Sequence, residues 1–353
     1  MTKKGLLIGI NYTSIPQSTL HGCIDDIENM TKVLVEQYGY ERENIIQLRD
    51  DIGQFQFQPT RTHILELLNR IIADGTPDDE IWIHYSGHGS QIPDMASYRA
   101  DHLDEVIVPI DYNSAGFITD KEIFEIIRNS KCKTVLVFDS CHSGSICDLQ
   151  WSFEFNGGSF SKSLNVNKTI ANPNVFCLSG CKDAQTSADS YSNELHEAVG
   201  AFTDALIHCL ALHNYNVNIM RLYGEICLYL HAEGFSQKPM LSCSSVVPNF
   251  VFSSVVGSYP PAKPYEMTIE TTTPVVAVAT TDASISTEPL PLPVTTTVVY
   301  DPPIPIISVA VTAPAPAPAP APVPVPQRPP PVNMGNFQFS VVTRPKPQMG
   351  MHF

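Results

Sequence analysis

The sequence predicts an α/β domain with a mainly parallel central sheet flanked by helices, followed by a disordered C-terminal tail. Short apolar runs in the first 250 or so residues are bounded by polar or glycine-rich sequence. Helical patterns lie between these runs, an alternation typical of a parallel sheet that is covered on both faces. Most of the 30 prolines lie after Tyr259, where charges are few.

The apolar runs predict buried strands, and the amphipathic patterns between them predict helices. The expected strands are Gly5–Ile10, Glu80–Tyr85, Thr134–Phe138 and Val175–Leu178. The expected helices are Asp26–Tyr38, Thr60–Ala73, Asp120–Asn129, Ala201–His213 and Val217–Ala232. The third helix has a capping box, with Thr119 as the cap and Glu122 three residues later.

We place the folded domain at residues 1–252. Its first part, residues 1–150, carries the two candidate functional segments, which contain His88 and Cys141. A linker at about 151–172 follows, and residues 173–252 complete the domain. Residues 253–353 carry long Pro, Ala, Val and Thr runs, which cannot bury enough apolar surface to offset their ordering entropy. The Ala-Pro repeats at Ala313–Pro322 favour polyproline II. This tail is either a ligand for a peptide-recognition domain or an extended spacer.

Charge and cysteine content narrow the class of protein. The chain has 21 Lys and Arg against 36 Asp and Glu, a net charge of -15, which argues against nucleic-acid binding and favours cationic partners. Nine irregularly spaced cysteines without a secretory signal indicate reduced thiols and a cytoplasmic location. No stretch reaches the roughly 20 apolar residues of a membrane span, so we expect a soluble protein.

Two glycine-rich segments follow predicted strands and carry the chemistry. Tyr-Ser-Gly-His-Gly contains His88, and Phe-Asp-Ser-Cys-His-Ser-Gly contains Cys141. Because the carboxyl ends of parallel strands share one edge, we expect His88 and Cys141 to be neighbours. Cys141 is the candidate nucleophile and His88 its base, with a spacing similar to that of caspases. The backbone amides of Gly89 and Cys141 are candidates for an oxyanion hole, and no organic cofactor is required.

Other residues allow less specific interpretations. His84 and His88 have the spacing of a helical zinc site, but Ser86-Gly87 interrupts any helix there. Cys177 and Cys181 could pair with each other or bind a metal, although core thiols are the simpler interpretation. Asp25 suits a helix cap as well as a functional acid. The remaining cysteines are expected in the core: Cys132, Cys147, Cys209, Cys227 and Cys243.

The two segments resemble the histidine and cysteine motifs of metacaspases, and further blocks resemble that family in the same order. These blocks are Leu20–Asp26, Asp104–Asp111, Leu178–Cys181 with Gln185–Asp189, and Gln237–Pro239. The resemblance implies a caspase-like three-layer fold over roughly residues 3–252 and a cysteine endopeptidase that cuts after Arg or Lys. It also implies a specificity pocket formed by Asp26, Ser86 and Asp139, with Cys23 nearby. Two carboxylates and a hydroxyl suit a basic side chain and would repel aspartate.

The resemblance further implies calcium activation and self-processing. The calcium ligands would be Asp104, Asp120 and Asp148, although Lys121 stands where the family pattern has a second acid and would weaken the site. The activating cut would fall in the Gly-, Ser- and Asn-rich stretch 149–174, at Lys162 or Lys168.

Two other functions remain to be weighed against the peptidase. One is a non-catalytic caspase-like scaffold that acts through its proline-rich tail. The other is an aspartate-specific caspase, which Asp26 and Asp139 disfavour.

Overall fold

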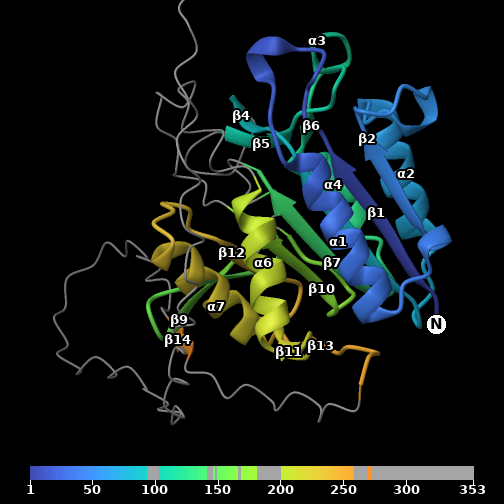
Figure 1. Cartoon of the computed structure of the whole chain (residues 1–353). Coiled ribbons are helices and arrows are strands. Elements are labelled where there is room, and N and C mark those ends of the chain that lie inside the picture. The colour runs from blue at the N-terminus through green and yellow to red at the C-terminus, as the bar shows by residue number, and fades with distance from the viewer. Residues whose placement is uncertain are drawn as a thin grey trace, which may run out of the picture. The chain divides into compact units, whose positions relative to one another are not determined.

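The computed structural model describes residues 1–93, 103–140, 146–147, 149–165, 168–180, 200–257 and 269–271. Its main feature is a nine-stranded sheet in the order β14-β9-β8-β12-β10-β7-β3-β1-β2 (Figure 1). Cys141, Asp148 and Cys181 lie outside the described residues, as does the predicted tail except for 253–257 and 269–271. The domain division and the role of the tail therefore stay predictions.

Five strands in the middle and at one side of this sheet are parallel to one another. They are β1 (Lys3–Gly9), β2 (Ile45–Arg49), β3 (Glu80–Ser86), β7 (Lys133–Asp139) and β10 (Val175–Ser179). The other side adds β12 (Met240–Cys243), β8 (Trp151–Phe155), β9 (Phe160–Leu164) and β14 (Ile269–Thr271), of which only β14 pairs in parallel. The prediction of a mainly parallel central sheet is confirmed.

Helices cover both faces of the sheet, giving three layers (Figure 1). One face packs against α1 (Cys23–Tyr38), α6 (Ala201–Leu212) and α7 (Ile219–Ala232). The other packs against α2 (Arg61–Ala73) and α4 (Asp120–Ile127). Successive residues of a strand point to opposite faces, so in β3 Trp82 joins the first core while Ile83 and Tyr85 join the second. All five predicted helices are present, and the capping box of Thr119 and Glu122 is confirmed.

Short elements lie at both edges of the sheet, and one group of them lies at its carboxyl edge (Figure 1). A three-stranded antiparallel sheet contains β4 (Gly89–Pro93), β5 (Leu103–Ile107) and β6 (Ile118–Thr119). The others are α3 (Tyr112–Ala115), the pair β11 (Val217–Asn218) and β13 (Val251–Phe252), and 3-10 turns at Pro16–Ser18, Arg42–Asn44 and Phe55–Phe57. Because β4 begins directly after His88, the small sheet holds the C-terminal end of the histidine segment.

The segment expected to be a linker at about 151–172 instead contains the β8–β9 hairpin, which corrects the expectation of a loop. Phe153 and Phe160 are buried against α7, and Gly157 and Gly158 supply the positive φ values of the turn. The alternating aromatic pattern of these strands is hidden in a composition rich in Gly, Ser and Asn.

The cysteines expected in the core carry free thiols, all buried except the half-buried Cys227. Reduced thiols therefore contribute to the apolar interior rather than to cross-links. Within the described ranges, no helix combines the length and the apolar character needed to cross a bilayer.

Candidate active site

The histidine and cysteine segments leave neighbouring strands at one edge of the sheet. β3 pairs directly with β7, with Ser86 opposite Asp139, and on the other side of β7 Ser179 lies opposite Phe138. His88 follows Ser86 by two residues and Cys141 follows Asp139 by two. The pairing supports the expected proximity of the two segments, although the Cys141 side chain itself lies outside the described residues.

Three of the predicted pocket residues meet at this edge, on the face that packs against α1 and α6. Ser86 Oγ donates a hydrogen bond of 2.6 Å to Asp26 Oδ2, which reaches down from the first turn of α1. Cys23, the first residue of α1, is fully buried and interacts with the Ser86 side chain. The predicted grouping of Asp26, Ser86 and Cys23 is therefore present in the structure.

Asp139 completes this group from β7. Its Oδ2 accepts a hydrogen bond of 2.8 Å from the backbone N–H of Thr203, near the N-terminus of α6. Burial raises the pKa of Asp139, although the amides of α6 oppose the rise. Burial, and then the nearby charge of Asp139, raise the pKa of Asp26 as well. Two carboxyl groups thus share a buried site, where each disfavours the ionised form of the other.

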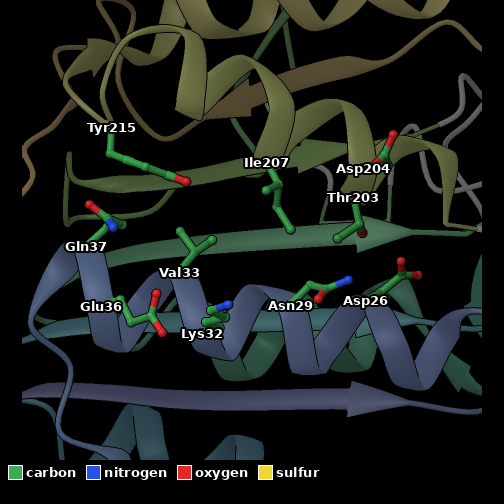
Figure 2. A pocket seen from close by; sticks show the side chains of 10 residues that line it. All are labelled: Asp26, Asn29, Lys32, Val33, Glu36, Gln37, Thr203, Asp204, Ile207 and Tyr215. Carbon is green, nitrogen blue, oxygen red and sulfur yellow. The ribbon is translucent and has the colours of Figure 1, made fainter. Parts of the chain in front are cut away.

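A polar groove of about 350 Å³ approaches this carboxyl pair between helices α1 and α6. Figure 2 shows Asp26 and Asp204 at one end and Gln37 and Tyr215 at the other. Asp26 therefore lines a groove between helices α1 and α6. The full lining is Asp26, Asn29, Lys32, Val33, Glu36, Gln37, Thr203, Asp204, Ile207 and Tyr215.

The imidazole of His88 is oriented by a backbone carbonyl. Its Nε2 lies 2.8 Å from the carbonyl oxygen of Ser18, and the Tyr12 ring packs beside it with centroids 4.7 Å apart. Because a carbonyl oxygen can only accept, Nε2 must carry a hydrogen. In the neutral ring, Nδ1 then holds the lone pair that can take a proton.

The backbone of His88 is held by two buried tyrosines. Its N–H donates to Tyr12 Oη (3.1 Å), and its carbonyl accepts from Tyr85 Oη (2.7 Å). Burial raises the pKa of Tyr12, so this hydroxyl stays protonated and donates to the carbonyl of Val108 (2.6 Å). Gly87 has no room for a side chain, because a Cβ would lie 2.7 Å from Tyr85 Oη. The histidine is thus fixed through its ring and its main chain.

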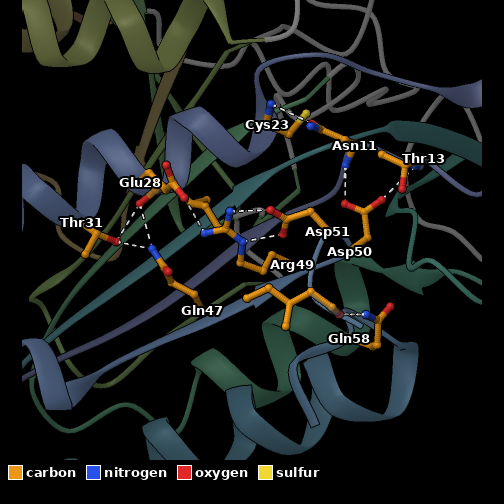
Figure 3. Close-up of polar contacts among 12 residues, drawn as sticks. Asn11, Thr13, Cys23, Glu28, Thr31, Gln47, Arg49, Asp50, Asp51 and Gln58 are labelled. Atoms are coloured by element: carbon orange, nitrogen blue, oxygen red, sulfur yellow. Dashed lines mark hydrogen bonds and ion pairs between the residues drawn. The ribbon is translucent and has the colours of Figure 1, made fainter. Parts of the chain in front are cut away.

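The loop that supplies the Ser18 carbonyl is tied down by Asp50, which follows β2 (Figure 3). Asp50 accepts hydrogen bonds from the backbone N–H groups of Asn11 (2.9 Å) and Thr13 (3.0 Å). Asn11 Oδ1 accepts in turn from the N–H of Cys23 (3.1 Å), which links the loop to α1. Neither Ser18 nor Asp50 emerged from the sequence, because a backbone carbonyl can come from any residue type.

The backbone amide of Gly89 points away from the small sheet. Gly89 pairs with Ile107 and His88 with Val108, and the N–H of Val108 donates to the carbonyl of His88 (3.2 Å). Hydrogen-bonded and non-hydrogen-bonded pairs alternate in an antiparallel ladder. The Gly89–Ile107 pair is therefore of the second kind, so the Gly89 N–H is directed away from β5.

The two histidines of the alternative zinc site make separate contacts. His84 is fully buried within β3, where its Nε2 lies 3.2 Å from Thr203 Oγ1, and burial lowers its pKa to about 3. His84 is therefore a neutral core residue, whereas His88 is bonded to the loop at Ser18.

The predicted calcium ligands Asp104 and Asp120 lie in β5 and at the first position of α4, and Asp148 lies outside the described residues. Lys121 Nζ is 2.9 Å from Asp104 Oδ1 and 3.1 Å from Oδ2. Within the described ranges, no three His, Cys, Asp or Glu side chains are arranged to hold a metal ion. Asp104 and Asp120 therefore do not fit a calcium ion in this arrangement, because an ammonium group already binds the first carboxylate.

The two candidate autolysis residues lie in different environments. Lys162 is in β9, with its Nζ 5.5 Å from the centroid of the Trp151 ring. Lys168 is only 5% exposed, and its Nζ lies 4.5 Å from the centroid of Phe124. Neither lies in an open loop, so its role in autolysis stays a prediction.

Comparison with known proteins gives one consistent family. Residues 3–150 match the model of the metacaspase, peptidase C14 domain. The chain is 33% identical over 303 residues to Metacaspase-1A of Aspergillus oryzae, covering 73% of this chain and 71% of that protein. It is 33% identical over 289 residues to Metacaspase-1 of Cryptococcus neoformans, covering 69% of this chain and 62% of that protein.

Among solved structures, caspase-1 from Spodoptera frugiperda matches with a TM-score of 0.44 and 12% identity, covering 69% of this chain and 87% of the other. A protein from Geobacter sulfurreducens matches with a TM-score of 0.48 and 18% identity, covering 70% of this chain and 95% of the other. The identity and coverage of the curated relatives, together with the histidine and cysteine segments at one sheet edge, show that this chain belongs to the metacaspase family of cysteine-type peptidases.

Proposed function

We propose that this peptidase is an endopeptidase that cleaves after arginine or lysine. The observation that carries the proposal is the pair of buried carboxyl groups, Asp26 and Asp139. Asp26 accepts a hydrogen bond from Ser86, which lies opposite Asp139 in the sheet, and Asp139 stands two residues before the expected nucleophile. Burial and mutual repulsion raise the pKa of Asp26, so a cation at this site would be favoured. A guanidinium supplies both the charge and several N–H donors, whereas a substrate aspartate would add a third acid.

The same placement couples specificity to reactivity. With the basic side chain of the substrate directed at Asp26 and Asp139, the following carbonyl would lie near Cys141. His88 Nδ1 takes the thiol proton, and the thiolate sulfur bonds to the carbonyl carbon. The proton then passes to the leaving amine as the C–N bond breaks. A water molecule, deprotonated by His88, hydrolyses the thioester that remains and regenerates the thiol.

Backbone groups support the charges that develop in these steps. The Ser18 carbonyl accepts from His88 Nε2, and this hydrogen bond favours the imidazolium formed when Nδ1 takes the proton. The Gly89 N–H, directed away from β5, is available to stabilise the substrate oxyanion together with the Cys141 N–H. The Ser18 carbonyl and the Gly89 N–H both depend on the position of the main chain rather than on a particular side chain.

Self-processing, at Lys162 or Lys168, belongs to the same proposal. Peptidases bind extended chain that is not already paired, so cleavage at Lys162 requires β9 to leave β8. Lys168 would have to leave its contact with Phe124. The free thiols of the core support a reducing compartment such as the cytoplasm as the place of action.

Fluorogenic peptides ending in Arg, Lys or Asp test the proposal directly. Purified full-length protein should turn over the Arg and Lys substrates and leave the Asp substrate intact. Cys141→Ala should abolish turnover, whereas Cys227→Ala, which removes a half-buried thiol in α7, should retain it. Faster turnover of the Asp substrate would contradict the specificity. Absence of all turnover would instead favour the non-catalytic scaffold.

A further inference from the structure

Lys121 connects the two described acids of the predicted calcium set. Its ammonium binds both carboxylate oxygens of Asp104, at 2.9 and 3.1 Å. Its backbone N–H donates to Asp120 Oδ1 at 2.8 Å. Both acids are buried, Asp120 to the extent that only 1% of its surface is exposed. One lysine therefore joins β5 to the first turn of α4 through its side chain and its main chain.

A second ammonium lies on the same face of α4. The Nζ of Lys168 is 4.5 Å from the centroid of Phe124, which follows Asp120 by four residues and so lies one helical turn along that face. Asp120 and Lys168 both act electrostatically on the buried thiol of Cys147, and Lys168 acts on Lys121. The two lysines and the two acids thus form one group between β5, α4 and the stretch 168–174 that precedes β10.

Among the described residues of this group, the two ammonium groups offset the charge of the two buried acids. Buried carboxylates need a compensating charge, and two ammonium groups bring the same charge as one divalent cation. A calcium ion would need six or more oxygen ligands at about 2.3–2.6 Å. The ammonium of Lys121 already stands against both oxygens of Asp104, within that coordination space.

We propose that Lys121 and Lys168 replace the divalent cation that metacaspase membership implies at Asp104 and Asp120. The lysines hold β5, α4 and the stretch 168–174 together, so the domain reaches its folded arrangement without calcium. The family pattern has an acid at position 121. On this proposal, the lysine found there supplies the positive charge that a bound metal ion would otherwise supply. This proposal concerns ion binding and does not depend on which peptide bond the enzyme cuts.

Calcium binding by the wild-type full-length chain is the first test. Thermal unfolding in EGTA should match that in millimolar calcium chloride or magnesium chloride, and isothermal titration with calcium should give no saturable heat. A ligand at free concentration c that binds only the folded state stabilises it by RT ln(1 + c/Kd), so a calcium site that is saturated at millimolar calcium would raise the melting temperature by several degrees. Saturable heat, or a rise specific to calcium, in the wild-type protein would overturn the proposal.

Lys121→Glu restores an acid and releases Asp104, so this variant should gain a saturable calcium heat and a calcium-dependent rise in melting temperature. Lys131→Glu, at an exposed lysine just before β7, makes the same change of charge and should gain neither. Equal responses of the two variants would contradict the proposal. If Lys121→Glu does not fold in EGTA, recovery of its unfolding transition on adding calcium gives the same answer, and the wild-type titration decides in any case. Because no readout is enzymatic, the result is independent of the proposed peptidase specificity.

Discussion

The Nε2 atom of His88 lies 2.8 Å from the backbone carbonyl oxygen of Ser18, and this contact assigns the ring hydrogen to Nε2. The side chain of Ser18 is irrelevant to the contact, so the position of the loop decides it. Asp50 fixes that loop through the N–H groups of Asn11 and Thr13. Asp50 therefore positions the proposed general base indirectly, through this loop.

Asp50→Ala should lower kcat for an arginyl substrate by roughly tenfold with little change in KM. The reason is that a shift of about 1 Å in a catalytic group can cost up to about 100-fold in rate, while the specificity pocket is left intact. Asp51→Ala is the matched control, because Asp51 bonds to the side chain of Arg49 and not to the loop (Figure 3). Steady-state kinetics of the two variants, at a temperature well below unfolding, would separate them. Equal kcat values would show that Asp50 does not position His88.

The strands of the sheet could be predicted from sequence because they are continuous apolar runs. β3 and β7 were expected within a residue or two of their observed ends, and the shared edge followed from parallel pairing. The short strands β4, β5 and β6 could not be predicted, because half-polar segments of two to five residues become strands only when they pair.

The candidate site also has residues that the sequence predicts and contacts that it does not. Asp26, Ser86 and Asp139 came from a resemblance, and the structure adds the hydrogen bond from Ser86 to Asp26 and the one that Asp139 accepts from Thr203. The amide of Thr203 could not be foreseen, because it reaches Asp139 from a helix 64 positions further along the chain. Long-range main-chain contacts of this kind leave no pattern in residue type.

Asp26→Asn should reduce kcat/KM for arginyl substrates by about 10- to 100-fold, which corresponds to about 1.4–2.7 kcal/mol of transition-state stabilisation. The variant keeps an oxygen that can accept from Ser86 Oγ but removes the charge that a guanidinium would meet. Asp25→Asn is the control, since Asp25 is exposed in the same turn of α1 and should change kcat/KM by less than about twofold. A comparable loss in Asp25→Asn would instead make Asp25 a functional acid.

The affinity for an arginine side chain should rise with pH through the window above the ordinary carboxyl pKa of 3.8. In the free enzyme the pKa values of Asp26 and Asp139 are raised, so at the lower end of this window the pair is partly protonated. A bound guanidinium favours the ionised form, so binding releases protons and strengthens as pH rises until the pair is fully ionised. The competitive inhibition constant of argininamide, measured from about pH 5 to 8, reports this without a catalytic step.

Citrullinamide is the matched ligand for this measurement, because it has nearly the same shape and no charge. Its inhibition constant should vary little with pH, and the ratio of the two inhibition constants removes any pH effect that both ligands share. Identical pH profiles for the two ligands would show that the carboxyl pair does not bind the guanidinium.

Gly87→Ala should both destabilise the domain and lower kcat. The new Cβ would lie 2.7 Å from Tyr85 Oη, 2.9 Å from its Cζ and 3.2 Å from Tyr12 Oη, so these buried rings would have to move. Overpacking of this kind costs about 1–3 kcal/mol of unfolding free energy. Both hydroxyls bond to the backbone of His88, so their displacement also shifts the proposed general base.

Gly53→Ala supplies the comparison, because a Cβ at Gly53 meets no atom within 4 Å. Its unfolding free energy should be unchanged or raised by up to about 1 kcal/mol, since alanine restricts the unfolded chain. Denaturant unfolding and arginyl-peptide kinetics measured on both variants give the two readouts. If Tyr12 and Tyr85 form a rigid link to His88, Gly87→Ala must lose both unfolding free energy and kcat. A loss of unfolding free energy with an unchanged kcat would show that the tyrosine contacts serve only packing.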